Sequence, residues 1–206
     1  MALYLLRHGA LPPNPQRRFV GQRDLPLTPR GRRQIAFWAD MLARTPLKRI
    51  LCSSLQRGRD TARIIGSRHP RTPVIPSDAF REIHLGHWEG LTPAEVEERF
   101  PGAYAARGRC LADYCPHGGE SFRMLARRVL PALRDALWDA LSPDAEEHVL
   151  LAAHGGVIRV ILAYALAIPL ERLLDIPQPY AACTRLEPGS DFFDALPGFL
   201  NGADLP

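Results

Sequence analysis

Near its start the chain reads Leu3-Tyr4-Leu5-Leu6-Arg7-His8-Gly9. Four apolar residues in succession are typical of a strand that is buried on both faces, as in a parallel sheet. The run ends in a cation, an imidazole and a glycine, and ligands of open α/β sheets bind just beyond the carboxyl ends of the strands. The guanidinium of Arg7 suits phosphate or carboxylate oxygens, and His8 offers a nucleophile or a general base. The stretch therefore predicts a sheet with a site at this strand end.

Length and composition fit one well-buried domain, because 206 residues with 46% apolar content can enclose a sizeable core. No apolar run approaches the length that spans a membrane, so we expect no membrane partner and no export signal. The net charge of +4 comes from arginines dispersed among acids, which favours anionic small molecules over nucleic acid. The 4 cysteines show no tight pairing pattern, so we expect reduced thiols and a cytoplasmic location.

Strand-like and helix-like segments alternate along the chain. Apolar runs predict strands at 3–6, 50–52, 74–75, 148–153 and 182–186, and the prolines around 74–75 place that strand at a sheet edge. Amphipathic patterns predict helices after Thr28, Ser54, Thr92 and Ser121, the last continuing to Leu141, and an apolar helix over 157–166. The stretch 101–119 is expected to be irregular, and the tail from Pro188 shows no core pattern. The alternation predicts an α/β layer architecture with a mostly parallel sheet.

The expected helix starts carry recognisable capping residues. Thr28 precedes a proline, which fits an N-cap followed by the first helical position, and Thr92 opens a capping box. Ser121 is the expected N-cap of the long helix. Ser54 is the expected N-cap of the second helix, which places Arg57 in the first helical turn, where free N–H groups favour an anion.

Two expected strand ends deliver an imidazole and glycines to the same edge of the sheet. The strand at 148–153 ends in His154-Gly155-Gly156, as the first strand ends in His8-Gly9. With Arg7 and Arg57 this edge gathers two guanidinium groups and two imidazoles, which suit the oxygens of a dianionic phosphoryl group. No metal-binding or Walker-type motif occurs, and the histidines and cysteines lack zinc-site spacing. We therefore expect neither a metal nor another cofactor.

Five motifs in order resemble the histidine phosphatase superfamily, which includes the cofactor-dependent phosphoglycerate mutases. They are Leu6-Arg7-His8-Gly9, 53–57 (Ser-Ser-Leu-Gln-Arg), 81–90 (Arg-Glu-Ile-His-Leu-Gly-His-Trp-Glu-Gly), 118–121 (Gly-Gly-Glu-Ser) and 153–156 (Ala-His-Gly-Gly). The resemblance extends to about Leu186. It implies a three-layer α/β/α fold like that of phosphoglycerate mutase, with a catalytic domain over 1–187 and a tail over 188–206. The compact chain and the 118–121 segment are most similar to the alpha-ribazole phosphatases of cobalamin synthesis.

The resemblance also assigns catalytic roles. It makes His8 the nucleophile that becomes phosphohistidine, and it makes Arg7, Arg57 and His154 the groups that hold the phosphoryl oxygens. Glu82 would protonate the leaving oxygen and then activate the water that hydrolyses phosphohistidine. Each role is chemically sound, because an imidazole is an adequate nucleophile near neutral pH and an alkoxide leaves poorly without a proton.

Several assignments are less direct. Glu89 is the rival acid, and Glu82 is preferred because its place in the motif matches the family. Further phosphate or substrate contacts are expected from Asn14, Gln22, Arg23 and Gly155. Family members often read Gly-Glu-Thr where this chain reads Gly9-Ala10-Leu11, so a hydroxyl near the phosphate is missing.

The sequence therefore predicts a phosphoric monoester hydrolase of the histidine phosphatase type. Its substrate is expected to be a small phosphorylated metabolite, with alpha-ribazole 5'-phosphate as a candidate. Two alternatives are a phosphoglycerate-type mutase and, from another class, a non-catalytic module that binds a phosphorylated ligand. The sequence leaves the substrate open, and it leaves open whether the chain forms a homodimer.

Overall fold

A five-stranded sheet forms the centre of the protein, for which the computed structural model describes residues 1–138, 147–189 and 191–196. The strands are β1 (Leu3–Arg7), β2 (Leu47–Ser53), β3 (Val74–Ser77), β4 (His148–Ala153) and β5 (Cys183–Leu186). They lie in the order β3-β2-β4-β1-β5, and only β5 is antiparallel to its neighbour. The mostly parallel sheet and the edge position of β3 confirm the sequence prediction.

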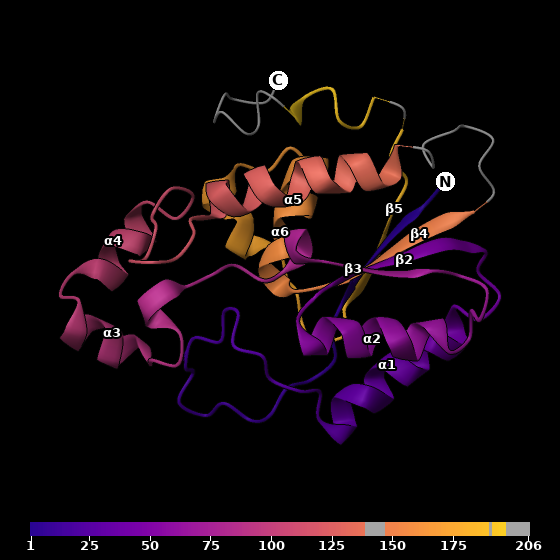
Figure 1. Cartoon of the computed structure of the whole chain (residues 1–206). Helices are drawn as coiled ribbons and strands as arrows, with labels where there is room; N and C mark the ends of the chain where they lie inside the picture. Colours follow the sequence, from indigo (N-terminus) through magenta and orange to yellow (C-terminus); the bar gives the residue numbers. More distant parts are fainter. Residues whose placement is uncertain (139–146, 190, 197–206) are drawn as a thin grey trace.

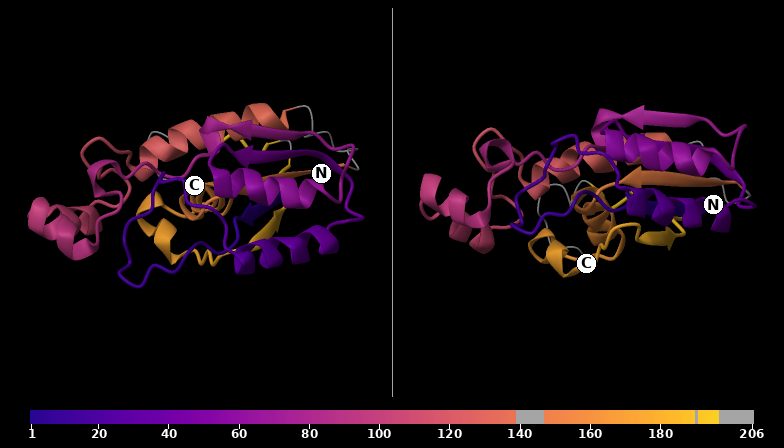
Figure 2. Two further views of the ribbon diagram at one scale, coloured as in Figure 1. Left: turned by 60° about the horizontal axis from the view of Figure 1, so that its bottom comes forward. Right: turned by 90° about the horizontal axis from the view of Figure 1, so that it is seen from below.

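Helices cover both faces of the sheet, so the fold has three layers (Figure 1). On one face lie α1 (Pro29–Met41) and α2 (Gln56–Gly66), and on the other lie α5 (Phe122–Leu137) and α6 (Gly155–Ala165). Figure 2 shows α3 (Pro93–Arg99) and α4 (Ala103–Arg109) beyond the end of the sheet. Three 3₁₀ turns complete the described chain: η1 (Asp78–Phe80), η2 (Gly86–Trp88) and η3 (Leu170–Asp175). No helix among the described residues is long and apolar enough to span a bilayer.

The uninterrupted apolar run of β1 follows from this layering. Leu3 and Leu5 belong to the core beneath α5 and α6, whereas Leu6 belongs to the separate core beneath α1 and α2. The central neighbour β4 divides its side chains in the same way, and Leu5 pairs with Leu151 across the two strands. A central parallel strand is buried on both faces, so it shows no polar alternation.

Several local expectations are confirmed. The side chains of Thr28 and Ser121 accept hydrogen bonds from Gly31 N and Met124 N at the starts of α1 and α5. Thr92 and Glu95 form the expected capping box of α3. Within the described residues α5 ends at Leu137, and the continuation of its apolar pattern to Leu141 lies outside them.

Three expectations are wrong. The N-cap of α2 is Leu55 and not Ser54, because the Ser54 hydroxyl bonds Asp78 while Asp24 Oδ1 accepts from Gln56 N. The stretch 101–119, expected to be irregular, contains α4. The start of the tail does carry core residues, since Phe193 and Leu196 are buried against the α5–α6 side of the sheet; the division at residue 187 stays a prediction.

A close crossing of two backbone segments fixes the route of the chain out of β1. Gly9 and Ala10 cross the first turn of α1 at Gly31, where a Cβ on either glycine would overlap a backbone carbonyl. Thr28 stabilises the crossing, because its backbone N–H and its hydroxyl both donate hydrogen bonds to Ala10 O. The crossing sends the long loop 10–28 back over the carboxyl ends of the strands.

We predict that Gly31→Ala lowers the free energy of unfolding by about 1–3 kcal/mol, the usual cost of forcing extra atoms into a packed site. Gly108→Ala is the matched control, because Gly108 also lies within a helix but has open space around its Cα. It should raise stability by about 0.5–1 kcal/mol through helix propensity. Urea unfolding of both variants measures the two changes, and equal effects would contradict the tight crossing.

Candidate active site

The ends of β1 and β4 place two histidines side by side. Arg7 pairs with Ala153 in the sheet, and His8 N donates to Ala153 O at 3.0 Å. The rings of His8 and His154 meet edge to face with centroids 5.2 Å apart. Both side chains are buried, with 3% and 0% of their surface exposed. The adjacency expected from two parallel strand ends is therefore present.

Hydrogen bonds fix opposite tautomers on the two imidazoles. Nδ1 of His8 lies 2.8 Å from Gly9 O, and since a carbonyl only accepts, Nδ1 carries the hydrogen and Nε2 keeps its lone pair. Nδ1 of His154 lies 3.2 Å from Nε of Arg57, which only donates, so the hydrogen of His154 is on Nε2. That Nε2 is buried without a partner among the described residues. One ring therefore offers a lone pair and the other an N–H donor.

Both imidazoles are neutral near pH 7. Burial lowers the pKa of His8 to about 3, and the charges of Arg57 and Arg7 add to this effect while the Gly9 carbonyl opposes it. Burial also lowers the pKa of His154 far below its ordinary value, assisted by Arg57 and His8.

Arg57 links His154 to the long loop 10–28 through hydrogen bonds. It lies in the first turn of α2, as expected, and only 1% of its surface is exposed. Its Nη1 and Nη2 donate to Arg23 O and Gly21 O, each at 2.7 Å. Each terminal nitrogen keeps a second hydrogen for another acceptor. Burial lowers the pKa of Arg57, and the nearby carboxylate of Glu82 opposes the shift.

Arg7 lies beneath an aromatic ring that the sequence analysis did not identify. Its Cζ is 4.4 Å from the centroid of Tyr180, whose ring centroid is 5.5 Å from that of His8. Nη1 of Arg7 donates to Gln178 O, while Nε is buried without a partner among the described residues. Tyr180 follows two prolines in a segment without periodicity, so no local signal marks it.

Glu82 reaches the site from a segment between η1 and η2. Its two carboxylate oxygens each lie 3.1 Å from Gly156 N, in the first turn of α6, and Oε1 also accepts from Ile83 N at 2.9 Å. A helix N-terminus favours a negative charge at this place. A Cβ on Gly156 would overlap Glu82 Oε1, so the second glycine after His154 is what admits the carboxylate.

The rival acid, Glu89, is engaged elsewhere. Its Oε1 accepts from Gln22 N at 2.7 Å and from Leu85 N at 3.1 Å. A Cβ on Gly21 would overlap the same oxygen, and Gly21 has a positive φ of 51°. Glu89 therefore fastens the loop, and the Gln22 side chain extends the link by donating to Glu82 O at 2.9 Å.

The other expected contact residues occupy different places. Asn14 is exposed, and its amide group bonds both the N–H and the carbonyl of Arg18, so it closes its own loop. Asn14, Arg23 and Tyr180 line a cavity of about 230 Å³, together with Leu11, Pro12, Pro13, Arg18, Val20 and Leu25. Gly155 lies against the Arg7 guanidinium, 3.5 Å from Cζ to a Cβ built there. Among the described residues no three His, Cys, Asp or Glu side chains are grouped as a metal site would require.

The chain belongs to the histidine phosphatase superfamily (branch 1), whose family model matches residues 3–196. It is a phosphatase, a phosphoric monoester hydrolase. The glucosyl-3-phosphoglycerate phosphatase of Mycolicibacterium vanbaalenii is 38% identical over 82% of this chain and 76% of its own. The adenosylcobalamin/alpha-ribazole phosphatase of Salmonella typhimurium is 30% identical over 84% and 83%. The mycobacterial glucosyl-3-phosphoglycerate phosphatase in complex with VO3 superposes with a TM-score of 0.80, at 34% identity over 93% of each chain.

We predict that the two buried histidines make the protein sensitive to acid. Their folded pKa values lie below the unfolded value of about 6.5, so between about pH 6.5 and 3 the unfolded chain binds protons that the folded chain does not. The free energy of unfolding therefore falls as the pH is lowered through this range, by up to about 1.4 kcal/mol per pH unit for each histidine.

Urea unfolding at pH 7.5, 6.0 and 5.0 measures the slope. His8→Asn removes one of the titrating groups, so its slope between pH 6.0 and 5.0 should be smaller by about one proton. A wild-type slope in this variant would contradict a neutral, buried His8.

Proposed function

We propose that this protein hydrolyses small phosphate monoesters through phosphohistidine on His8. The observation that carries the proposal is the fixed tautomer of a neutral His8, whose Nε2 lone pair is free while Nδ1 is held by Gly9 O. Nε2 attacks phosphorus and the P–O bond to the alcohol breaks. Water then attacks the phosphohistidine, the N–P bond breaks, and inorganic phosphate leaves. The covalent intermediate divides one difficult displacement into two easier ones.

Buried donors support binding of the phosphoryl oxygens. Arg7 Nε and His154 Nε2 are buried N–H groups without a partner among the described residues, and Arg57 retains hydrogens beyond those given to the loop. Leaving buried donors unpaired costs free energy, which a bound oxyanion would recover. The two guanidinium groups supply the positive charge that a metal ion supplies in other phosphatases, so the proposed reaction uses no metal.

Glu82 is the proposed proton donor to the leaving oxygen and the base for the attacking water. Its carboxylate lies against the helix start that follows His154, and its charge acts on both Arg7 and Arg57. Glu89 is held by the backbone amides of Gln22 in the long loop and of Leu85 in its own segment, which supports the preference for Glu82.

The cavity beside Tyr180 supports a substrate whose alcohol part is small and polar or anionic. The guanidinium of Arg23 lines this cavity and makes no hydrogen bond or ion pair with the described residues. A carboxylate on the substrate would pair with it. The relatives at 38% and 34% identity are named glucosyl-3-phosphoglycerate phosphatases. Glucosyl-3-phosphoglycerate carries a carboxylate, so it is the first substrate to test. Alpha-ribazole 5'-phosphate is the second.

We predict a phosphoenzyme at His8. Mixing enzyme with labelled substrate and quenching without acid should trap label on the protein, and His8→Ala should abolish both label and turnover because no other free imidazole lone pair is offered at the site. His148→Ala is the control, since His148 begins β4 at the opposite end of the strand from the site. It should retain both label and turnover. Label that persists in His8→Ala would refute the nucleophile.

We predict that Glu82→Gln slows phosphorylation by an alkyl phosphate by about 10²–10⁴, because a basic alkoxide needs a proton to leave. Phosphorylation by p-nitrophenyl phosphate should slow much less, since p-nitrophenolate leaves largely unaided. Single-turnover rates with the two esters measure the difference. Glu89→Gln is the matched control, because loosening the loop should slow both esters alike. Equal losses in Glu82→Gln, or a selective loss in Glu89→Gln, would reassign the acid.

A further inference from the structure

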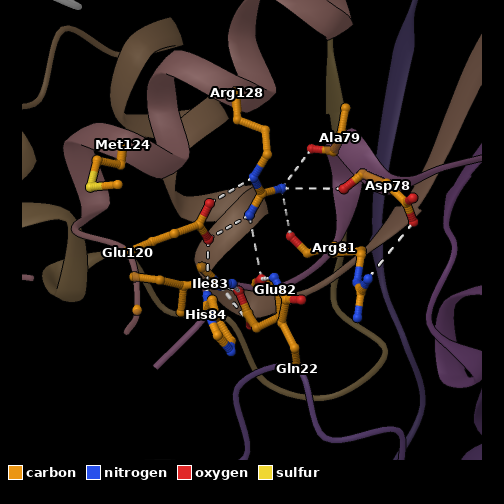
Figure 3. A network of polar contacts seen from close by, with 12 residues as sticks. Gln22, Asp78, Ala79, Arg81, Glu82, Ile83, His84, Glu120, Met124 and Arg128 are labelled. Atoms are coloured by element: carbon orange, nitrogen blue, oxygen red, sulfur yellow. Dashed lines mark hydrogen bonds and ion pairs between the residues drawn. The ribbon is translucent and has the colours of Figure 1, made fainter. Parts of the chain in front are cut away.

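Arg128, on α5, donates hydrogen bonds to several backbone carbonyls of the segment that carries Glu82 (Figure 3). Nη1 donates to Ala79 O at 2.8 Å and to Arg81 O at 3.0 Å, and Nη2 lies 3.4 Å from Glu82 O. The first of these carbonyls belongs to η1, and those of Arg81 and Glu82 lie in the irregular stretch between η1 and η2. One planar guanidinium therefore holds the irregular stretch against the end of η1, where no helix or strand orders its backbone.

Glu120 completes the arrangement from the residue just before the N-cap of α5. Its carboxylate forms a bidentate pair with Arg128, 2.9 Å from Oε1 to Nε and 2.8 Å from Oε2 to Nη2. Oε2 also accepts from His84 N at 2.9 Å, and Glu120 N donates to His84 O at 2.7 Å. Figure 3 shows the carboxylate between the guanidinium and the segment. Arg128 thus binds the backbone up to Glu82, and Glu120 binds the backbone just after it, at His84.

The same helix also supports the group that Glu82 contacts. Leu125 of α5 packs beneath Gly156, with its Cδ2 3.5 Å from a Cβ built on that glycine. Gly156 N is the donor to the Glu82 carboxylate. Leu125, Val129 and Leu133 are fully buried, so close packing in the core holds α5 in place. It fixes both the backbone of Glu82 and the helix start that receives its carboxylate.

We propose that Glu120 and Arg128 are positioning residues for the acid, holding the Glu82 carboxyl group at the place from which it protonates the leaving oxygen. The inference rests on the proposed function, because it takes Glu82 as the proton donor. It assigns a role to Glu120 of the 118–121 motif that the catalytic chemistry leaves unused. A displacement of about 1 Å in a catalytic group is enough to cost a large factor in rate.

The ion pair between Arg128 and Glu120 is expected to remain formed at neutral pH. The side chains of Arg128 and Glu120 are 23% and 18% exposed, so water screens them only in part. Burial alone would raise the pKa of Glu120, but the hydrogen bonds from Arg128 and from the His84 amide lower it overall. Glu120 therefore remains ionised and bound to Arg128 until the pH falls through that lowered pKa.

The test compares leaving groups in Glu120→Gln and Arg128→Lys. Each variant keeps the approximate size of its side chain, and the lysine keeps the charge, but neither reproduces the fork of hydrogen bonds. Phosphorylation by glycerol phosphate should slow by about 10–10²-fold in single turnover, whereas phosphorylation by p-nitrophenyl phosphate should change less than about threefold. In a Glu82→Gln background the same substitutions should add almost nothing, since groups that act as a unit are not additive.

Asp113→Asn is the matched control, because it breaks a bidentate pair with Arg123 near the start of the same helix, away from Glu82. It should leave both esters unchanged, and thermal unfolding of all variants separates altered catalysis from loss of fold. Equal losses for both esters, no loss, or additive losses in the Glu82→Gln background would overturn the positioning role. A Glu82→Gln enzyme without selectivity would instead overturn the proposed acid, so the two failures are distinguishable.

Discussion

Arg57 donates Nε–H to Nδ1 of His154 in the buried centre of the protein, and this contact determines much of what surrounds it. The bond decides which nitrogen of His154 carries a hydrogen, and its charge helps to keep both histidines neutral. The other arms of the guanidinium hold the loop 10–28 through the carbonyls of Gly21 and Arg23. A single side chain from α2 therefore fixes the tautomer of His154, adds to the lowering of the pKa of both histidines and holds the loop 10–28.

Burying this cation would be expensive without such partners. Three acceptors, together with the more distant charges of Glu82, Asp24 and Glu89, offset part of the cost and oppose the lowering of the Arg57 pKa. Other costs remain, because Arg7 Nε and His154 Nε2 are buried without partners among the described residues. Such unpaired donors weaken the folded state and are found where a ligand pairs with them. These donors are the ones to which the proposed function assigns the phosphoryl oxygens of a substrate.

The residues that could be predicted from the sequence are those that directly follow a regular element or begin one. Arg7, His8 and His154 follow apolar runs, and parallel strands bring their carboxyl ends together, so their meeting could be predicted. Capping by Thr28 and Ser121 depends only on nearby residues and was also predictable. The N-cap of α2 was not, because the acceptor that bonds Gln56 N comes from Asp24 in a distant loop. Polar side chains near a helix start compete for its amides, and tertiary contacts decide which one binds.

The sequence by itself determined the layered fold, the family and the gathering of two imidazoles and two guanidinium groups at one edge of the sheet. These follow from apolar periodicity and from motifs whose residues are close along the chain. Only the tertiary structure decided which nitrogen of each histidine is protonated, that Tyr180 covers Arg7, and that Glu120 and Arg128 hold the segment of Glu82. Each depends on directional hydrogen bonds or ring contacts between segments far apart in sequence. Such contacts leave no periodic trace in the chain, because they are specified by where the fold places a donor and an acceptor.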